Sequence, residues 1–436
     1  MLGSPDGDCI VAHPPYWIRR GRVPRCLLPP FLAGEDPVPL LDLRIDHGLV
    51  VELLPHGVAP DLDNVPDQDI DQQGGWILPA LADLHTHLDK AHTWDRSPNL
   101  DGTFAGAIAA VERDRPNWSH DDLYCRMDYS LGMAYYHGMA ALRTHLDCPP
   151  EHMALTLEVF LELQQHWRDR LVLEAVSLVT LDQYFTPAGV ALADRLAEIG
   201  GILGGVAYPH PELDAQLDRV FQLAQDRQLR LDFHADETGD PQSNALERIA
   251  AAALRHGYTD PIVCGHCCVL AVQDHATVNH TLDLVQSCDL TVVSLPLCNL
   301  FLQDRQAGRT PRWRGVTLVH ELQARGIPVA IASDNCDDPF YAYGEHDLIA
   351  TYQLSSQITH LDLYPHQSIP TITSVPSRHL GTTGTFYSGM AADLMLFSAT
   401  SHRELIARSQ GDRTILRGGI RQERHLPAPL SRHHPV

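Results

Sequence analysis

The strongest constraint on the fold of this chain is a regular alternation of apolar, strand-like runs with helix-length amphipathic segments. Counting from a strand at residue 77, the runs lie at residues 77–78, 139–145, 171–179, 201–207, 229–234, 261–266, 290–295 and 327–333. Apolar residues three and four positions apart mark intervening helices, at residues 151–168, 188–199, 213–227, 244–256 and 317–325. Eight strand-helix units over roughly 300 residues predict an α/β fold, a (β/α)8 barrel of the TIM type.

The two ends of the chain have a different pattern. Short β segments are expected at residues 9–11, 40–45, 49–54, 77–78, 393–397 and 414–417, separated by turns rich in Pro, Gly and Asp. We therefore predict that residues 1–78 and 381–436 together build one small β-sandwich domain, and that residues 79–380 form the barrel.

Composition excludes several classes of partner. The 436 residues carry a net charge of -23, which argues against a nucleic-acid polymer because phosphate contacts need an excess of Lys and Arg. No stretch approaches 18 apolar residues and no export signal is recognisable, so no membrane partner is expected. Ten scattered cysteines suit reduced thiols, and we predict a cytoplasmic protein. The sequence leaves open whether the chain forms a homo-oligomer.

Polar residues that follow the apolar runs point to a metal site. In a (β/α)8 barrel the active face lies at the carboxyl ends of the strands. His85 and His87 follow the first run, and the period of two along a strand places both imidazoles on one face. His234, His266 and Asp334 close the fifth, sixth and eighth runs. Three imidazoles and one carboxylate, from His85, His87, His234 and Asp334, suit one Zn2+ or Fe2+ with room for water.

Three further residues, Glu237, His266 and Lys90, each allow a functional and a purely structural interpretation or two different contacts. Glu237 stands where a proton shuttle would lie, or is a solvated loop acid as we expect Asp236 and Asp240 to be. His266 orients the attacking water or polarises the substrate, or is a core histidine with satisfied hydrogen bonds. Lys90, the only lysine among 32 basic residues, pairs with an acid at the barrel mouth or touches the substrate.

These residues carry a resemblance to a known family. The motifs are His85-Thr86-His87-Leu88-Asp89, Arg143-Thr144-His145-Leu146-Asp147, His234-Ala235-Asp236-Glu237, Gly265-His266, Asp334 and Asp338-Pro339-Phe340-Tyr341. With them the chain resembles the cytosine deaminase branch of the amidohydrolase superfamily over most of its length.

The resemblance implies a role for each matching residue. It implies that His85, His87, His234 and Asp334 bind the metal, and that His145 is not a ligand. It further implies that Glu237 shuttles protons to a ring nitrogen, that His266 assists, and that Phe340 lies over the substrate ring. Binuclear relatives need a carboxylated lysine on the fourth strand, and no lysine follows Lys90. One divalent ion is therefore expected.

Two positions depart from the cytosine deaminase pattern. Those enzymes read the pyrimidine amide with a glutamine, where this chain has Thr180 in the aligned region, with Gln183 out of register. Asn335 replaces a second aspartate after the metal ligand, and Ser333-Asp334-Asn335 is instead similar to N-isopropylammelide isopropylaminohydrolase. We expect Thr180, Asn335, Phe340 and Lys90 to contact the substrate.

The sequence thus predicts a mononuclear, metal-dependent hydrolase that replaces an exocyclic amine on a nitrogen heterocycle by oxygen and releases ammonia. Hydrolysis of a cyclic amide or of an N-alkylamino substituent is the alternative within enzymes. A barrel that binds a small molecule without chemistry is the alternative from another class.

Overall fold

The computed structural model describes residues 14–32, 34–59 and 69–430. The chain divides into two compact units, one of residues 1–80 and 385–423 and the other of residues 81–384 and 424–436. The β segment expected at residues 9–11 lies outside the described residues. Within the described ranges, no helix is long and apolar enough to cross a bilayer.

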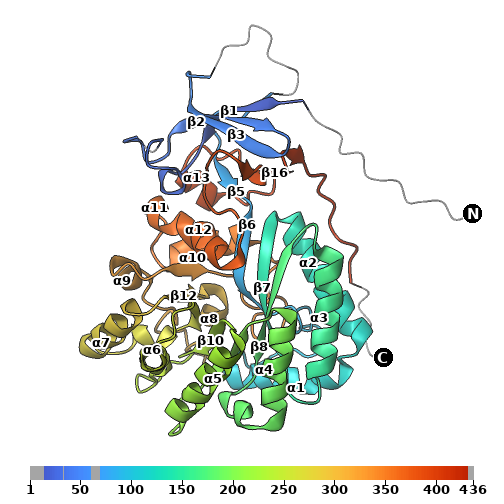
Figure 1. The fold of residues 1–436 in the computed structure, drawn as a ribbon, viewed down its shortest axis with the longest axis vertical. Coiled ribbons are helices and arrows are strands. Elements are labelled where there is room, and N and C mark those ends of the chain that lie inside the picture. Colours follow the sequence, from blue (N-terminus) through green and yellow to red (C-terminus); the bar gives the residue numbers. More distant parts are fainter. Residues whose placement is uncertain (1–13, 33, 60–68, 431–436) are drawn as a thin grey trace, which may run out of the picture. The chain divides into compact units, whose positions relative to one another are not determined.

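The first unit holds two β-sheets made from both chain ends (Figure 1). The five-stranded sheet has the order β14-β3-β2-β1-β4 and the four-stranded sheet the order β17-β16-β15-β5. Their strands are β1 (Tyr16–Arg22), β2 (Leu40–Asp46), β3 (Leu49–Pro55), β4 (Ile70–Asp71), β5 (Ile77–Pro79), β14 (Met390–Ala391), β15 (Leu394–Leu396), β16 (Thr414–Arg417) and β17 (Ile420–Arg421). The unit also contains η1 (Arg25–Leu27) and α13 (His402–Ala407).

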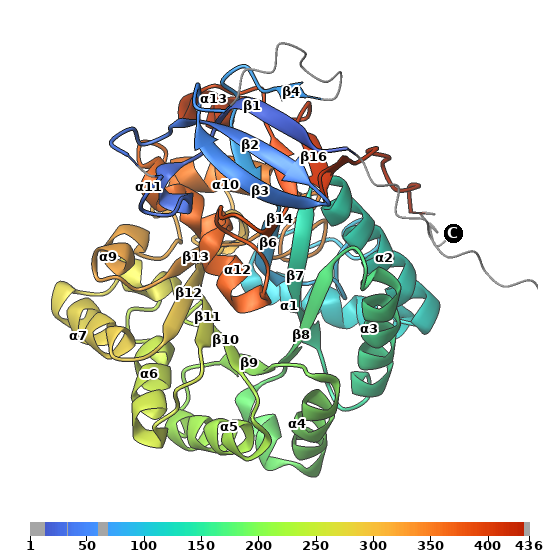
Figure 2. The ribbon, with the colours of Figure 1, turned by 45° about the horizontal axis from the view of Figure 1, so that its top comes forward.

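The second unit contains the parallel strands of the barrel, with helices α3 to α7 arranged around the outside of the strands (Figure 2). The strands are β6 (Leu81–Thr86), β7 (Met139–Asp147), β8 (Val172–Leu178), β9 (Leu203–Ala207), β10 (Leu231–Ala235), β11 (Ile262–His266), β12 (Leu290–Ser294) and β13 (Val329–Ile331). They form a three-stranded sheet, β6-β7-β8, and a five-stranded sheet, β13-β12-β11-β10-β9. Isolated parallel bridges join the two sheets, Val176 to Ile202 and Thr180 to Val206 on one side and Thr86 to Asp334 on the other. The predicted TIM-type α/β architecture is confirmed.

The helices of this unit include five that the sequence predicted and others that it did not. The predicted five are α3 (Met153–Trp167), α4 (Pro187–Ile199), α5 (Leu213–Arg227), α6 (Ala245–His256) and α9 (Val319–Ala324). The others are α1 (Phe104–Asp114), α2 (His120–Tyr136), α7 (His275–Gln286), α8 (Pro296–Leu302), α10 (Leu348–Ile358), α11 (Pro365–Ser368), α12 (Ser374–Leu380), η2 (Arg115–Asn117), η3 (Leu181–Phe185), η4 (Cys268–Ala271) and η5 (Ile369–Ile372).

The start of the barrel differs from the prediction. The run at residue 77 is β5, which pairs antiparallel with β15 in the first unit, and the first barrel strand is β6. Residues 77–86 form one nearly continuous apolar stretch, so periodicity alone cannot show that two strands of different sheets follow one another. The backbone N–H of Ala80 donates to Asp393, at the junction between the two strands.

Asp83 ties the first strand of the barrel to the last. Its carboxylate accepts hydrogen bonds from the hydroxyl of Ser333 at 2.5 Å and from the Ser333 backbone N–H at 3.3 Å. The backbone N–H of Asp334 donates to the carbonyl of His85 at 2.9 Å. These contacts bring Asp334, which follows β13, beside His85, although 249 positions separate these two residues in sequence.

A buried ion network lies within the barrel. Arg143 is 1% exposed and donates to Asp232 at 2.9 Å and to Glu174 at 2.7 Å. Burial raises the pKa of Asp232 to about 7, while Arg143 opposes the rise. Glu174 also accepts a hydrogen bond from Arg230 at 2.7 Å. Loss of Arg143 would therefore leave Glu174 with one arginine partner but Asp232 with none.

We expect Arg143→Ala to lower the free energy of unfolding by about 3–5 kcal/mol, because it leaves the Asp232 carboxylate buried without its cation. Urea unfolding followed by circular dichroism measures this loss. The control is the double variant Arg143→Met with Asp232→Leu, which removes both charges and should recover most of the stability. A loss below about 1 kcal/mol for the single variant would contradict the assigned role.

Candidate metal centre and active site

The chemistry-bearing residues of the second unit lie at the carboxyl ends of its parallel strands. His85 is on β6, with His87 one residue beyond the strand, His234 is on β10 and Asp334 lies just after β13. The backbones of Asp236, His266 and Asp334 have positive φ angles of 54°, 69° and 64°. Such left-handed residues are strained and gather at functional sites, and here they turn the chain at the ends of three strands.

Four side-chain atoms converge at this edge. The Nε2 atom of His234 lies 3.2 Å from Nε2 of His85 and 3.2 Å from Nε2 of His87. The Oδ1 atom of Asp334 lies 3.2 Å from Nε2 of His87 and 3.5 Å from Nε2 of His85. Four ligands about 2.1 Å from one ion are roughly 3.4 Å apart in a tetrahedral arrangement, so this spacing fits a divalent cation.

The hydrogen bonding of these groups also fits a cation. Burial is the largest cause that lowers the pKa of His85, His87 and His234 well below 6.5, so the three imidazoles face one another uncharged. Among the described residues, no nitrogen or hydroxyl donor reaches the buried carboxylate oxygens of Asp334, and only the weak thiol donor of Cys298 lies beside them. Burial raises the pKa of Asp334 to about 7. Buried polar atoms without a partner are costly, and a bound ion would satisfy all four residues at once.

His145 lies close to the cluster as well. The centre of its ring lies 3.9 Å from that of His85, with the two rings tilted by 32°. His85, His145 and His234 form a second set of side chains close enough to hold a metal. Neither ring nitrogen of His145 has a hydrogen-bond partner. Gly265 on β11 explains how the strands approach so closely, because a Cβ there would lie 2.8 Å from Cε1 of His85.

Glu237 and His266 share one partner, Asn299 of α8. The Nδ2 group of Asn299 donates to Oε1 of Glu237 at 3.2 Å and lies 2.9 Å from Nδ1 of His266. Because Nδ1 accepts this hydrogen bond, the proton of neutral His266 is at Nε2. Burial and the nearby Asp334 raise the pKa of Glu237 well above 4.5, and burial lowers the pKa of His266 to about 3. No sequence pattern marked Asn299.

Asp236 is not the solvated loop acid that the sequence suggested. It is 4% exposed, and its carboxylate accepts hydrogen bonds from the Ser243 hydroxyl and from the backbone N–H groups of Ala245 and Leu246. Asp236 therefore caps the first turn of α6 and holds the segment that joins His234 to Glu237. The left-handed backbone of Asp236 turns the chain, so that its side chain faces the start of α6.

A cavity of about 320 Å³ adjoins the four converging atoms. Every residue that the sequence predicted for the site lines it except His85, which is fully buried. Phe340 and Phe104 provide aromatic surface and their rings meet edge to face at 5.7 Å. A cavity of this size suits one planar heterocycle of one or two rings.

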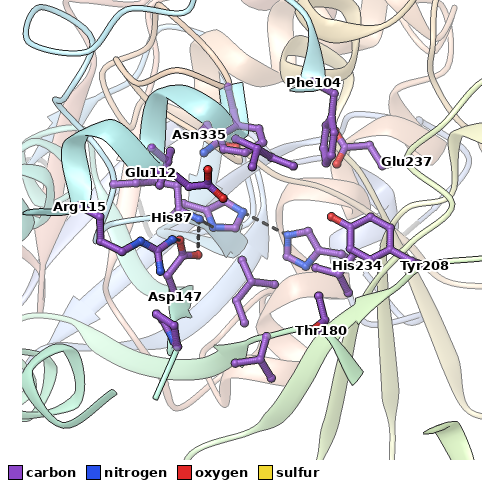
Figure 3. Close-up of a pocket in the computed structure, with 18 of the residues that line it drawn as sticks. His87, Phe104, Glu112, Arg115, Asp147, Thr180, Tyr208, His234, Glu237 and Asn335 are labelled. Carbon is purple, nitrogen blue, oxygen red and sulfur yellow. Dashed lines mark hydrogen bonds and ion pairs between the residues drawn. The ribbon is translucent and has the colours of Figure 1, made fainter. Parts of the chain in front are cut away.

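Charged residues gather on one side of the cavity. Figure 3 shows Glu112, Arg115 and Asp147 to one side of the His87–His234 pair and Glu237 and Tyr208 to the other. The Asp147 carboxylate accepts from Lys90 at 2.6 Å and from Arg115 at 3.2 Å. Burial lowers the pKa of Lys90, but Asp147 and Asp89 outweigh it and leave the pKa raised.

Two of the residues expected to contact the substrate, Asn335 and Lys90, also interact with other side chains of the protein. The Nδ2 group of Asn335 donates one of its two N–H groups to Asp338 at 2.7 Å, which fixes the orientation of the amide. The ammonium of Lys90 lies 5.7 Å above the ring of Phe340 in addition to its pair with Asp147. Thr180 and Gln183 both line the cavity, although their spacing in sequence placed Gln183 out of register.

Sequence reasoning missed several residues that line the cavity. Asp147 is the last residue of β7 and Tyr208 follows β9, and these places at strand ends are a signal that could have found them. Glu112 and Arg115 come from α1 and η2, which stand in the long connection after β6. No local pattern distinguishes them from surface residues of an ordinary helix.

Comparison with known proteins places this geometry in a family. Residues 190–421 match the model of the amidohydrolase family. Pterin deaminase from Rhizobium rhizogenes (strain K84 / ATCC BAA-868) is 44% identical over 390 residues, which cover 88% of each chain. The crystal structure of 5-methylcytosine deaminase from Klebsiella pneumoniae aligns with a TM-score of 0.81 and 24% identity, over 95% of this chain and 100% of that one.

A second solved structure agrees in fold. N-isopropylammelide isopropylaminohydrolase from Burkholderia multivorans ATCC 17616 aligns with a TM-score of 0.72 and 21% identity, over 93% of this chain and 97% of that one. The family match and the histidine–aspartate cluster together indicate a divalent metal ion. From the matched family model and the identity to a relative across most of its length, we conclude that this chain belongs to the amidohydrolase family.

Proposed function

We propose that the chain is a hydrolytic deaminase of an amino-substituted bicyclic nitrogen heterocycle, with 2-amino-4-oxopteridine (pterin) as the representative substrate. The observation that carries the proposal is the cluster of His85, His87, His234 and Asp334 beside a cavity that also exposes Glu237 and His266. The 44% identity to a pterin deaminase supports the choice of ring. In this reaction water adds at the ring carbon that bears the amine, and ammonia leaves.

We assign one divalent ion, Zn2+ or Fe2+, to the four converging ligands. Their three nitrogens and one oxygen match the preferences of both metals. Such an ion, when bound, acts as a Lewis acid that makes a water molecule nucleophilic at neutral pH. The two compact units are, in the same proposal, a small β domain and the hydrolase barrel that carries the whole cavity.

The proton transfers are assigned to the chain's own groups. Asp334 accepts a proton from the attacking water, in addition to its role as a ligand. Glu237 takes the other proton of that water and passes it to a ring nitrogen, because its carboxyl group faces the cavity and can titrate. The proton on Asp334 then goes to the departing amine, which leaves as ammonia. Asn299 fixes both Glu237 and the Nε2–H of His266, which then points a donor at the oxygen or nitrogen that gains charge.

Substrate contacts follow from the cavity walls. Phe340 packs over the ring, and Lys90 stays charged between that wall and Asp147. Thr180 offers one hydroxyl in place of a glutamine amide, and Asp338 holds one of the two N–H groups of Asn335. The position that aligns with the glutamine of cytosine deaminases thus carries a hydroxyl, and the cavity has space for a second fused ring.

We expect pterin to exceed cytosine in kcat/KM by at least about tenfold, which corresponds to about 1.4 kcal/mol in the transition state. Ammonia release from pterins, purines, amino-pyrimidines and alkylaminotriazines, each at several concentrations, measures this ratio. Higher efficiency on cytosine than on every other amine would contradict the assignment and point to Gln183 as the amide reader. Alkylamine release without ammonia would favour the alternative hydrolase.

A further inference from the structure

A second group of metal-type ligands lies in the same unit, apart from the four that converge at the strand ends. His92 belongs to the connection after β6, and Cys336 and His346 belong to the loop after β13. One ligand atom from each lies within 4.8 Å of the others. Cys336 is a free thiol, and Cys336 and His346 are 1% and 3% exposed. The proposed deaminase mechanism uses none of the three.

The imidazole of His92 is oriented as a ligand imidazole would be. Oδ2 of Asp337 lies 3.3 Å from Nδ1 of His92, which favours the proton on Nδ1 and leaves the lone pair on Nε2. This Nε2 atom is buried and has no hydrogen-bond partner. A carboxylate behind the imidazole is the usual arrangement that fixes the tautomer of a metal-binding histidine.

His346 supplies the second observation. Both of its ring nitrogens are buried without a hydrogen-bond partner. A buried polar atom left in this state costs about 1–3 kcal/mol, so the chain would gain from a ligand at this position. The backbone N–H of His346 donates to the sulfur of Cys336, so the two residues are also joined through the main chain.

Acidic residues surround the group and favour a cation over a neutral contact. Asp337 lies beside His92, and Glu345 and Asp347 flank His346 in the chain. His137 packs on the same loop, with Nδ1 3.3 Å from Asp347 and Nε2 3.8 Å from Glu345. Among the described residues, no lysine or arginine side chain forms an ion pair with Asp337 or Glu345.

We infer that His92, Cys336 and His346 bind one Zn2+ ion, separate from the ion of the proposed catalytic centre. One thiolate and two imidazoles are a borderline-soft donor set that suits zinc, and a water molecule can complete four ligands. The ion links the connection that carries Lys90 to the loop that carries Asn335 and Phe340. Its role is to hold two walls of the cavity together.

The sulfur ligand gives this site a signature that the catalytic centre lacks. Protein prepared with Co2+ in place of zinc should bind two ions per chain and show a thiolate-to-cobalt charge-transfer band in the near ultraviolet. Cys336→Ser and His346→Ala should each remove one ion, and Cys336→Ser should abolish the band. His234→Ala should remove the other ion and keep the band.

A matched control is Cys298→Ser, which changes another buried cysteine near the cavity and should keep the band. Wild-type protein that holds one Co2+ per chain without a thiolate band would overturn the proposal, and this measurement needs no variant to fold. Loss of the band in His234→Ala but not in Cys336→Ser would also overturn it, because the sulfur would then belong to the other centre. An unchanged metal content in His234→Ala would instead count against the catalytic centre alone.

Discussion

Replacing His234 or Asp334 with alanine should remove the ion of the barrel-mouth cluster and lower activity by at least about 10³-fold, equivalent to about 4 kcal/mol. Each residue supplies one of four atoms that lie 3.2–3.5 Å from their neighbours, so its loss leaves the ion with three of the four ligands. Elemental analysis and ammonia release measure the two effects. The fold should remain, since the parallel strands do not depend on these side chains for their pairing.

The background for this experiment is the Cys336→Ser variant, so that only the barrel-mouth ion is counted. In that background we expect one ion per chain before the second substitution and none after it. His145→Ala is the control, because it alters a neighbouring buried imidazole that we do not assign as a ligand. If His145→Ala released the ion and His87→Ala did not, the set of His85, His145 and His234 would be the ligand set instead.

Glu237→Gln should retain the metal and lower kcat by about 10²-fold or more with little change in KM. The amide has almost the same shape as the carboxyl group but cannot carry a proton from one atom to another. Oε1 of Glu237 accepts from Asn299 at 3.2 Å, and an amide oxygen can still accept that hydrogen bond, so the position of the side chain is preserved. Steady-state kinetics on the preferred substrate, with metal analysis of the same sample, measure the effect.

Asp240→Asn provides the matched control, because Asp240 is an exposed acid in the same loop whose carboxylate accepts a hydrogen bond from the backbone of Gln242. It should leave kcat unchanged. Near-normal turnover in Glu237→Gln would mean that another group moves the proton, and Asp334 would be the first to test.

Local patterns in the sequence were sufficient to predict the architecture, and they singled out the polar side chains that lie together at the strand ends. A strand that is buried on both faces needs an unbroken apolar run, and the polar residue that ends such a run is conspicuous, as His234 and Asp334 are. The boundary between β5 and β6 escaped detection, since both are apolar and only their partners, β15 and β7, distinguish them.

What the sequence determined by itself is therefore the alternation of strands and helices and the identity of the side chains at the strand ends, because both depend on neighbours along the chain. Tertiary structure alone decided which of those side chains meet. The contact of Asn299 with Glu237 and His266, the pairing of Lys90 with Asp147, and the approach of His92 to Cys336 all join distant segments. Such contacts arise only when the strands pack side by side, and no local periodicity records them.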